Sequence, residues 1–159
     1  MKKIILFVML LSVTFASVAQ KKQEQKAVKS AIENFFQGFH KGDTLLLKTT
    51  IHTNLIAQTI FTSPKGDKVL RTTPKAYEAL LSFAKNVKPT DDYNEKILSY
   101  NIQIDGNLAS VWTPYEFYNK GKFSHCGVNS FQLFNNNGNW EIVYLIDTRN
   151  RNGCKVSEK

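Results

Sequence analysis

Long segments of alternating apolar and polar residues, joined by short turns rich in asparagine and glycine, fill the second half of the chain. The segments are KILSYNIQI, LASVWTPYEFY, KFSHCGVNSFQLF and NWEIVYLIDTR, and the turns between them are DGN, NKG and NNNG. Alternation with a period of two residues is typical of strands that bury one face, and such short turns connect antiparallel neighbours. We therefore predict an antiparallel meander of four long strands over residues 94–149.

The residues before this meander predict helices and a short hairpin. In AVKSAIENFFQGFHKGD the apolar residues recur at helical spacing, and Gly42 ends the pattern. Asp43 is a suitable N-cap for a second short helix, TLLLKTTI, and LIAQTIFTSPKGDKVLRTT predicts two strands around a turn. TPKAYEALLSFAKN predicts a third helix, with Thr73 as its N-cap and Pro74 at its first position. Three helices packed on a curved antiparallel sheet make an α+β fold.

The first twenty residues have the pattern of a secretory signal peptide. A basic start precedes an apolar run at residues 4–15, and a small-x-small site follows at residues 17–19. The apolar run is shorter than the ~20 residues of a transmembrane helix, and no cysteine follows the site, so we expect no stable membrane anchor. The predicted parts of the chain are a signal peptide at 1–19, a flexible leader at 20–26, one domain at 27–150 and a basic tail at 151–159. We expect a periplasmic or extracellular protein.

The net charge and the numbers of cysteines and histidines limit the partners and ligands that we expect. The formal net charge is +8, but much of the excess lies near the ends of the mature chain, without a basic stripe that carries stacking aromatics. We therefore do not expect nucleic-acid binding. Cys126 and Cys154 are an even pair in an exported protein, which predicts one disulfide that fixes the C-terminal tail. The three histidines lack metal-ligand spacing, so we expect no metal and no cofactor.

Turn lengths predict which strand residues share the buried face. A four-residue NNNG loop pairs Phe134 with Asn139, and a three-residue NKG loop pairs Tyr118 with Lys122. A two-residue Lys-Gly turn is the alternative, and it would bring Trp112 and Glu116 inward, because a shift of one residue exchanges the two faces. In the preferred register, Glu116 and Asp147 lie on the face opposite His125.

The buried face of this register is aliphatic at one end and polar at the other. An apolar cavity with a few converging polar groups is typical of a small-molecule site. The residues predicted to contact the ligand come from the strands and from the first helix, namely Tyr115, His125, Asn129, Tyr144, Thr148, Phe36 and Phe39. We expect the ligand to be small and apolar or aromatic.

Three stretches resemble one superfamily of domains. They are FFQGFHKGD, GNLASVWTPYEFYNKGKFSHCGVNSFQLF, and the ending from GNWEI to IDTR. Together with the order of elements, they resemble the nuclear transport factor 2-like superfamily, which includes ketosteroid isomerase, scytalone dehydratase and SnoaL-like cyclases. Small exported bacterial proteins described as lumazine-binding are similar. The resemblance implies a cone-shaped α+β fold, and enzymes of this superfamily use an acid–base group inside the cone.

Three functions remain open at this point. We expect a binding domain without catalysis, because no carboxylate of the preferred register faces inward beside His125. The first alternative is a dehydratase, isomerase or cyclase in which His125 is the general base and Tyr115 a proton donor, the two predicted catalytic residues. The second alternative is a structural or partner-binding module. Apolar residues on the outer face of the sheet predict a homodimer through that face.

Overall fold

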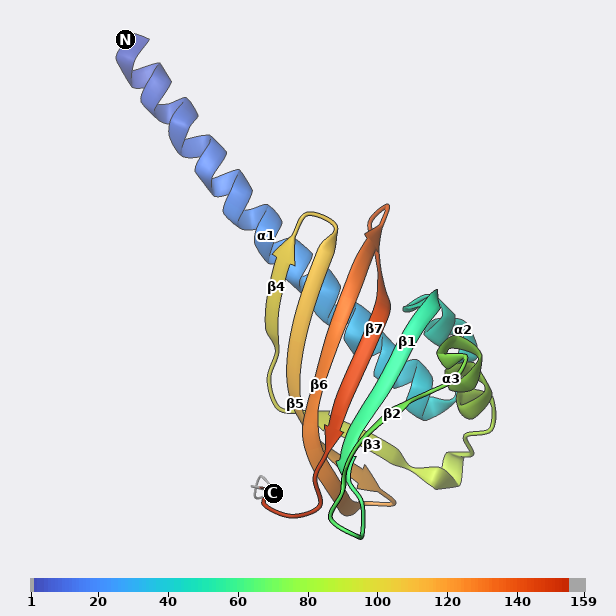
Figure 1. The fold of residues 1–159 in the computed structure, drawn as a ribbon. Helices are drawn as coiled ribbons and strands as arrows, with labels where there is room; N and C mark the ends of the chain where they lie inside the picture. The colour runs from blue at the N-terminus through green and yellow to red at the C-terminus, as the bar shows by residue number, and fades with distance from the viewer. Residues whose placement is uncertain (1, 155–159) are drawn as a thin grey trace.

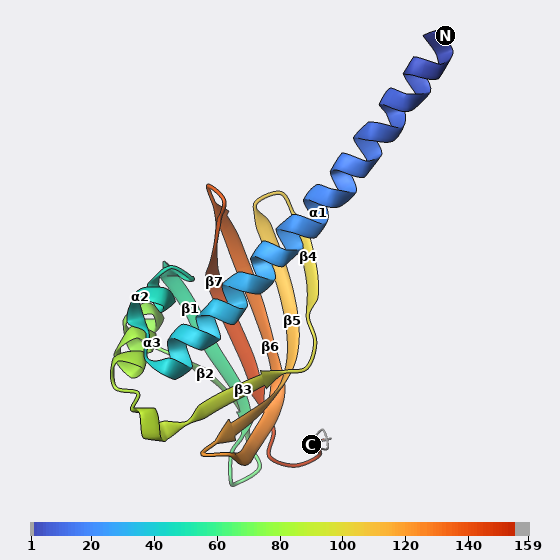
Figure 2. The ribbon, with the colours of Figure 1, turned by 180° about the vertical axis from the view of Figure 1, so that it is seen from behind.

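The computed structural model describes residues 2–154, and among these the side chains of residues 20–154 apart from Pro89. Three α-helices and a short 3-10 helix lie on one side of a curved, open sheet of seven strands (Figure 1, Figure 2). The helices are α1 (Lys2–Lys41), α2 (Thr44–Lys48), α3 (Ala76–Lys85) and η1 (Pro89–Asp91). The strands are β1 (Ile51–Thr62), β2 (Lys68–Thr72), β3 (Tyr93–Ile97), β4 (Asn101–Asp105), β5 (Leu108–Asn119), β6 (Lys122–Asn136) and β7 (Asn139–Arg149).

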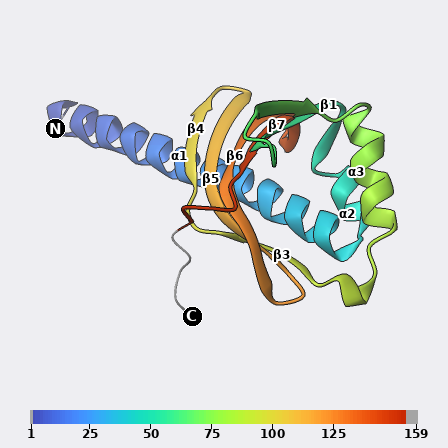
Figure 3. The ribbon, with the colours of Figure 1, turned by 60° about the horizontal axis from the view of Figure 1, so that its bottom comes forward.

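Helix α1 crosses the inner face of the sheet, which we define as the face that it covers (Figure 2, Figure 3). Val28, Ile32 and Phe35 are buried against the sheet, as the helical spacing predicts. The helix also includes residues 20–26, where the sequence predicts a flexible leader. Gly42 ends it with a φ of 76°, a conformation in which glycine is favoured. The signal peptide remains a prediction.

The ends of the shorter helices agree in part with the prediction. Asp43 caps α2, because its carboxylate accepts a hydrogen bond of 2.9 Å from the backbone N–H of Leu46. The predicted N-cap of α3 is wrong: the helix begins at Ala76 rather than after Thr73. The backbone N–H of Thr73 instead donates to the carbonyl of Ala57 and extends the hairpin of β1 and β2.

The sheet is mixed rather than wholly antiparallel. Its order is β2-β1-β7-β6-β5-β3, with β4 also paired to β5, and β1 runs parallel to β7. The segment predicted as one strand, KILSYNIQI, is divided between β3 and β4. Both pair with β5, β3 near the C-terminal end of β5 and β4 near its N-terminal end. Residues 98–100 separate the two strands, so the alternation is not continuous across them.

The turn between β5 and β6 has two residues, yet the predicted inner face of β5 is correct. Asn119, not Tyr118, pairs with Lys122. The register then shifts, because Tyr118 pairs with Phe123 and Phe117 with His125, which leaves Ser124 as an extra residue. This bulge restores the parity that the shorter turn would have changed. The residues of β5 predicted to face inward, Ala109, Val111, Thr113 and Tyr115, are buried, and so is Glu116, which was predicted to lie on the other face.

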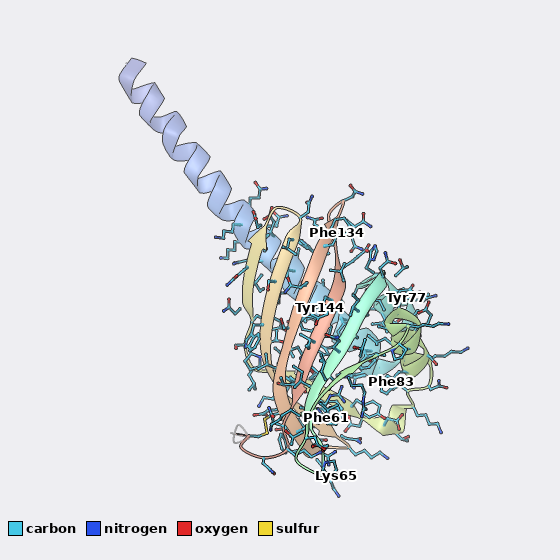
Figure 4. The ribbon with its side chains drawn as sticks, in the orientation of Figure 1. Phe61, Lys65, Tyr77, Phe83, Phe134 and Tyr144 are labelled. Carbon is cyan, nitrogen blue, oxygen red and sulfur yellow. A yellow bond between two sulfur atoms is a disulfide. The ribbon has the colours of Figure 1, made fainter. Side chains whose placement is uncertain are left out.

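The prediction for the second half of β7 is wrong. The turn before β7 again has two residues, since Asn136 pairs with Asn139. Trp140 and Ile142 are buried as predicted, but Val143 is an extra residue, because Leu133 pairs with Ile142 and Gln132 with Tyr144. Every later residue of β7 is therefore on the opposite face from the predicted one. Asp147 faces inward, whereas Tyr144 and Thr148, predicted as ligand contacts, face outward, as Figure 4 shows for Tyr144.

A disulfide joins Cys126 on β6 to Cys154 in the C-terminal tail, with the Cα atoms 5.9 Å apart. Cys126 also forms an isolated bridge with Asn150, so the tail lies beside the start of β6. Residues 155–159 of the predicted basic tail lie outside the described part. In the part of the chain that the structure describes, no helix combines the length and the apolar character that a membrane span requires.

Candidate functional site

A group of polar side chains lies on the inner face among the apolar residues of the core. Glu95 of β3 is at its centre: its Oε1 accepts a hydrogen bond of 2.6 Å from the side-chain amide of Asn129 on β6. Its Oε2 lies 3.9 Å from Nε2 of His40 on α1. The side chains of Glu95 and His40 are only 12% and 7% exposed. We call Glu95, His40, Asn129, Thr113, Tyr115 and Asp147 the inner cluster.

Burial shifts the pKa values of Glu95 and His40 in opposite directions. Desolvation raises the pKa of Glu95 to about 7; the nearby Asp147 adds to this shift, while the hydrogen bond from Asn129 opposes it. Desolvation lowers the pKa of His40 to about 4, and the positive charge of Lys41 lowers it further. At neutral pH His40 is therefore uncharged and Glu95 is close to half protonated. Their contact at 3.9 Å is consequently not an ion pair, although its distance would permit one.

Asp147 forms the second half of the inner cluster. Its carboxylate accepts a hydrogen bond of 2.6 Å from Oγ1 of Thr59 and one of 2.8 Å from Nε of Arg149. The phenol of Tyr115 donates to the backbone carbonyl of Thr148 at 2.9 Å and lies 3.4 Å from Oδ2 of Asp147. Burial and the negative charges of Asp147 and Glu95 raise the pKa of Tyr115, so it stays protonated.

Thr113 carries a polar atom without a partner. Its side chain is fully buried, and among the described residues its Oγ1 is the one buried side-chain polar atom that makes no hydrogen bond. Thr113 pairs with Asn129 across β5 and β6, so its hydroxyl belongs to the inner cluster. Leaving a buried hydroxyl unpaired costs about 1–3 kcal/mol, which the binding of a hydrogen-bonding molecule would recover.

The structure brings His125 and Tyr115 together, as the sequence predicts. Their rings meet edge to face with centroids 5.7 Å apart, and the ring of Phe117 lies 5.0 Å from that of His125. His125 Nδ1 is 3.1 Å from Oγ of Ser124. Burial and the positive charge of Arg149 lower the pKa of His125. In the described chain, the carboxylate that lies within 4 Å of a histidine nitrogen belongs to Glu95 and contacts His40, not His125.

Some predicted site residues therefore belong to the inner cluster or lie on its side of the sheet, and others do not. Those on the inner side are Phe36, Phe39, Tyr115, His125 and Asn129. Glu95 and His40 were missed by the sequence analysis. Glu95 lies between Tyr93 and Ile97 in a short alternating segment, YNEKI, and this alternation was the available signal. The predicted strand KILSYNIQI begins at Lys96 and therefore leaves Glu95 out.

Two cavities lie outside the inner cluster. The larger, of about 340 Å³, lies between the end of α3 and the start of β3 and is lined by Ser82, Phe83, Asn86, Val87, Asp91 and Tyr93. The smaller, of about 240 Å³, lies between α1 and the start of β7, beside Trp140. Neither includes a residue of the inner cluster. Tyr93, which lines the larger cavity, is on β3 two residues before Glu95.

Comparisons with proteins of known structure identify the fold. No protein-family model and no curated protein matches the chain. A nuclear transport factor 2-like protein from Cytophaga hutchinsonii is 15% identical, with a TM-score of 0.56 over 79% of this chain and 98% of its own. One from Novosphingobium aromaticivorans, with a cystatin-like fold, is 11% identical, with a TM-score of 0.64 over 89% and 90%.

A proposed dehydratase of the same type, from Streptomyces avermitilis, is 10% identical, with a TM-score of 0.61 over 82% of this chain and 98% of its own. The chain therefore has the nuclear transport factor 2-like fold, which confirms the fold predicted from its sequence. Sequence identities this low carry no information about the ligand. The SnoaL-like and lumazine-binding subtypes stay predictions.

Proposed function

We propose that this protein binds a small, partly apolar molecule at the inner cluster and does not transform it. The observation that carries the proposal is the unpaired, fully buried hydroxyl of Thr113, which lies opposite Asn129, the residue that donates to the nearly buried carboxyl of Glu95. A fold under selection for stability alone would not keep the unpaired hydroxyl of Thr113, since an apolar residue of the same size costs less there. The aromatic rings of Phe36 and Phe117 border His40 and give the site its apolar wall.

The inner cluster specifies what such a ligand must carry. Glu95 accepts hydrogen bonds when ionised and donates one when protonated, and the oxygen of Tyr115, whose proton is donated to the carbonyl of Thr148, can accept one. Thr113 offers both a donor and an acceptor. A ring compound with neighbouring donor and acceptor atoms would satisfy these groups, and its apolar edge would face the phenylalanine rings.

Native mass spectrometry of the protein purified from its own host tests the proposal. We expect a bound small molecule on the wild-type chain and its loss in Glu95→Gln and Thr113→Val. Glu33→Gln is the matched control, because Glu33 is an exposed acid on α1 that forms an ion pair with Lys29, and this variant should keep the ligand. A wild-type mass equal to that of the bare chain would contradict a tightly held ligand and favour a structural or partner-binding module.

A second candidate function is proton-transfer catalysis, and the environment of Glu95 favours it. A carboxyl with a pKa of about 7 takes up and releases a proton readily at neutral pH. The base would then be Glu95 rather than His125, because His125 has no carboxylate partner within hydrogen-bond distance in the described chain. Incubation of the loaded protein in D₂O separates the two functions. A base acting on a C–H bond would exchange a carbon-bound hydrogen of the ligand, and Glu95→Gln would abolish that exchange.

We further propose that the protein is exported and forms a homodimer through its outer sheet face. The signal-like start of the chain supports export. Ile56, Trp112 and Phe134 support the dimer, because they point away from α1 and are 50%, 54% and 40% exposed. Figure 4 shows Phe134 and Tyr144 on this face. Light scattering should give the mass of a dimer for the wild type and the mass of a monomer for Trp112→Lys. A monomer mass for both proteins would contradict the proposal. Cell fractionation tests export.

A further inference from the structure

We infer that the cavity between α3 and β3 is a second binding site, and that it accepts a small organic cation. Its volume of about 340 Å³ is at the lower end of the ~300–1,000 Å³ range of small-molecule sites. It is lined by the last turn of α3, the segment that follows it, and the first residue of β3, and it contains no residue of the inner cluster. The inference therefore does not depend on the function proposed above.

The charges that line this cavity favour a cation. Asp91 is the one lining residue that is charged at neutral pH, and its Oδ2 is fixed by a 2.8 Å hydrogen bond from the backbone N–H of Lys88. Within the described residues no lysine, arginine or histidine nitrogen lies within 4 Å of this carboxylate. The cavity also adjoins the C-terminal end of α3, where the helix dipole is negative.

The two aromatic rings of the cavity wall suit a cation that has an apolar surface. Phe83 and Tyr93 have ring centroids 5.6 Å apart with 37° between the ring planes, so one cation can lie within about 6 Å of both centroids. Phe83 is 41% exposed, so part of its ring is accessible to a bound molecule. Phe39 stacks on it at 4.5 Å and holds it in place.

The remaining polar groups define the ligand more closely. The amide nitrogen of Asn86, a residue of the cavity lining, donates to the backbone carbonyl of Ser82, so its amide oxygen remains an acceptor. Acceptors, a carboxylate and two rings match an alkylated or quaternary ammonium group whose short chain carries a hydroxyl or an N–H. An anion would meet the Asp91 carboxylate without a compensating positive group in the lining.

Choline and 3,3-dimethylbutan-1-ol make a sharp test, because the alcohol has the same shape with a neutral carbon in place of the charged nitrogen. We would titrate each into ¹⁵N-labelled protein and follow the backbone amide resonances. Choline should shift the amides of residues 82–93 saturably, and the neutral alcohol should shift them far less. Equal binding of the two compounds, no saturable shift with choline, or shifts centred elsewhere would overturn the inference.

Single substitutions then test whether Asp91 and Phe83 contribute to choline binding. Asp91→Asn keeps an oxygen for the Lys88 N–H but removes the charge, so it should weaken choline binding roughly two- to fivefold, and Phe83→Leu by a similar factor. Asp92→Asn is the matched control, because it removes the same charge one residue away and outside the cavity lining. It should leave the affinity for choline unchanged. An equal loss of choline affinity in Asp92→Asn would mean that the effect comes from the net charge of the region rather than from the cavity, and it would contradict the proposed site. Glu95→Gln should bind choline normally, whether or not the inner cluster binds its own ligand.

Discussion

Nε2 of His40 on α1 and Oε2 of Glu95 on β3 lie 3.9 Å apart, and the two residues have pKa values that are shifted in opposite directions. This relationship has a consequence for stability. Between about pH 4.5 and 6.5 the native state holds an extra proton on Glu95 and lacks one on His40, relative to the unfolded chain. The two contributions to the pH dependence of unfolding therefore largely cancel.

Removing either partner should reveal the contribution of the other. The raised pKa of Glu95 makes its contribution to stability decrease as pH rises from 4.5 to about 7. The lowered pKa of His40 makes its contribution decrease as pH falls from 6.5 to about 4. Between about pH 4.5 and 6.5, the free energy of unfolding of the Glu95→Gln variant should therefore increase as the pH rises. That of the His40→Gln variant should decrease as the pH rises. Each change should be on the order of 3 kcal/mol. Urea unfolding at four pH values measures both slopes, and the same slope in both variants would contradict the assignment.

Thr113→Val should leave stability unchanged or raise it by up to about 1 kcal/mol, because it replaces an unpaired buried hydroxyl with a methyl group of similar size. Thr50→Val is the matched control: Thr50 is 2% exposed, and its hydroxyl donates a 2.8 Å hydrogen bond to the carbonyl of Leu47. Its substitution should cost about 1 kcal/mol. Urea midpoints compare the two variants. A clear loss of stability in Thr113→Val would show that this hydroxyl has a structural partner.

Gly127→Ala should be strongly destabilising. Gly127 pairs with Tyr115 across β5 and β6, and an added Cβ would overlap the carbonyl oxygen of Thr148 and approach the Tyr115 ring to 2.9 Å. The substitution would push apart the two groups joined by the Tyr115–Thr148 hydrogen bond, at a cost of roughly 3 kcal/mol or more. Ser130→Ala, on the same strand, is the control and should be close to neutral. Thermal unfolding checks both variants, and similar midpoints would contradict the predicted overlap.

The sequence predicts the fold well, because it is determined by patterns that extend over many residues. The alternation in the four long segments and the turn residues between them predict the meander, and the spacing of Val28, Ile32 and Phe35 predicts the helix face that covers it. Each pattern repeats often enough that an error of one residue at a turn does not change the fold.

The site depends on single residues, and the sequence cannot specify these in the same way. One extra residue at Val143 reverses the orientation of every later side chain in β7, which brings Asp147 inward and turns Tyr144 and Thr148 outward. Nothing in the local alternation indicates this bulge. The bulge at Ser124 has the opposite effect, because it compensates for the two-residue turn and leaves the prediction for Tyr115 correct.

The disulfide between Cys126 and Cys154 should account for a large part of the stability of the domain. The two cysteines are 28 residues apart, and closing a loop of this length in the unfolded chain is worth about 3.6 kcal/mol in the chain-entropy model. The bond also fixes the tail beside the start of β6. Cys126 pairs there with Glu116 of β5, which is only 1% exposed. The double variant Cys126→Ser/Cys154→Ser should lower the free energy of unfolding by that amount, measured with urea.

Dithiothreitol provides the control, because it acts on the same bond without changing the packing of any side chain. Reduction should lower the urea midpoint of the wild type to that of the double variant and should leave the double variant unchanged. Equal stability of the oxidised wild type and the double variant would mean that the unfolded chain gains little freedom when the bond is lost. The tail would then be held by the backbone bridge between Cys126 and Asn150 rather than by the disulfide.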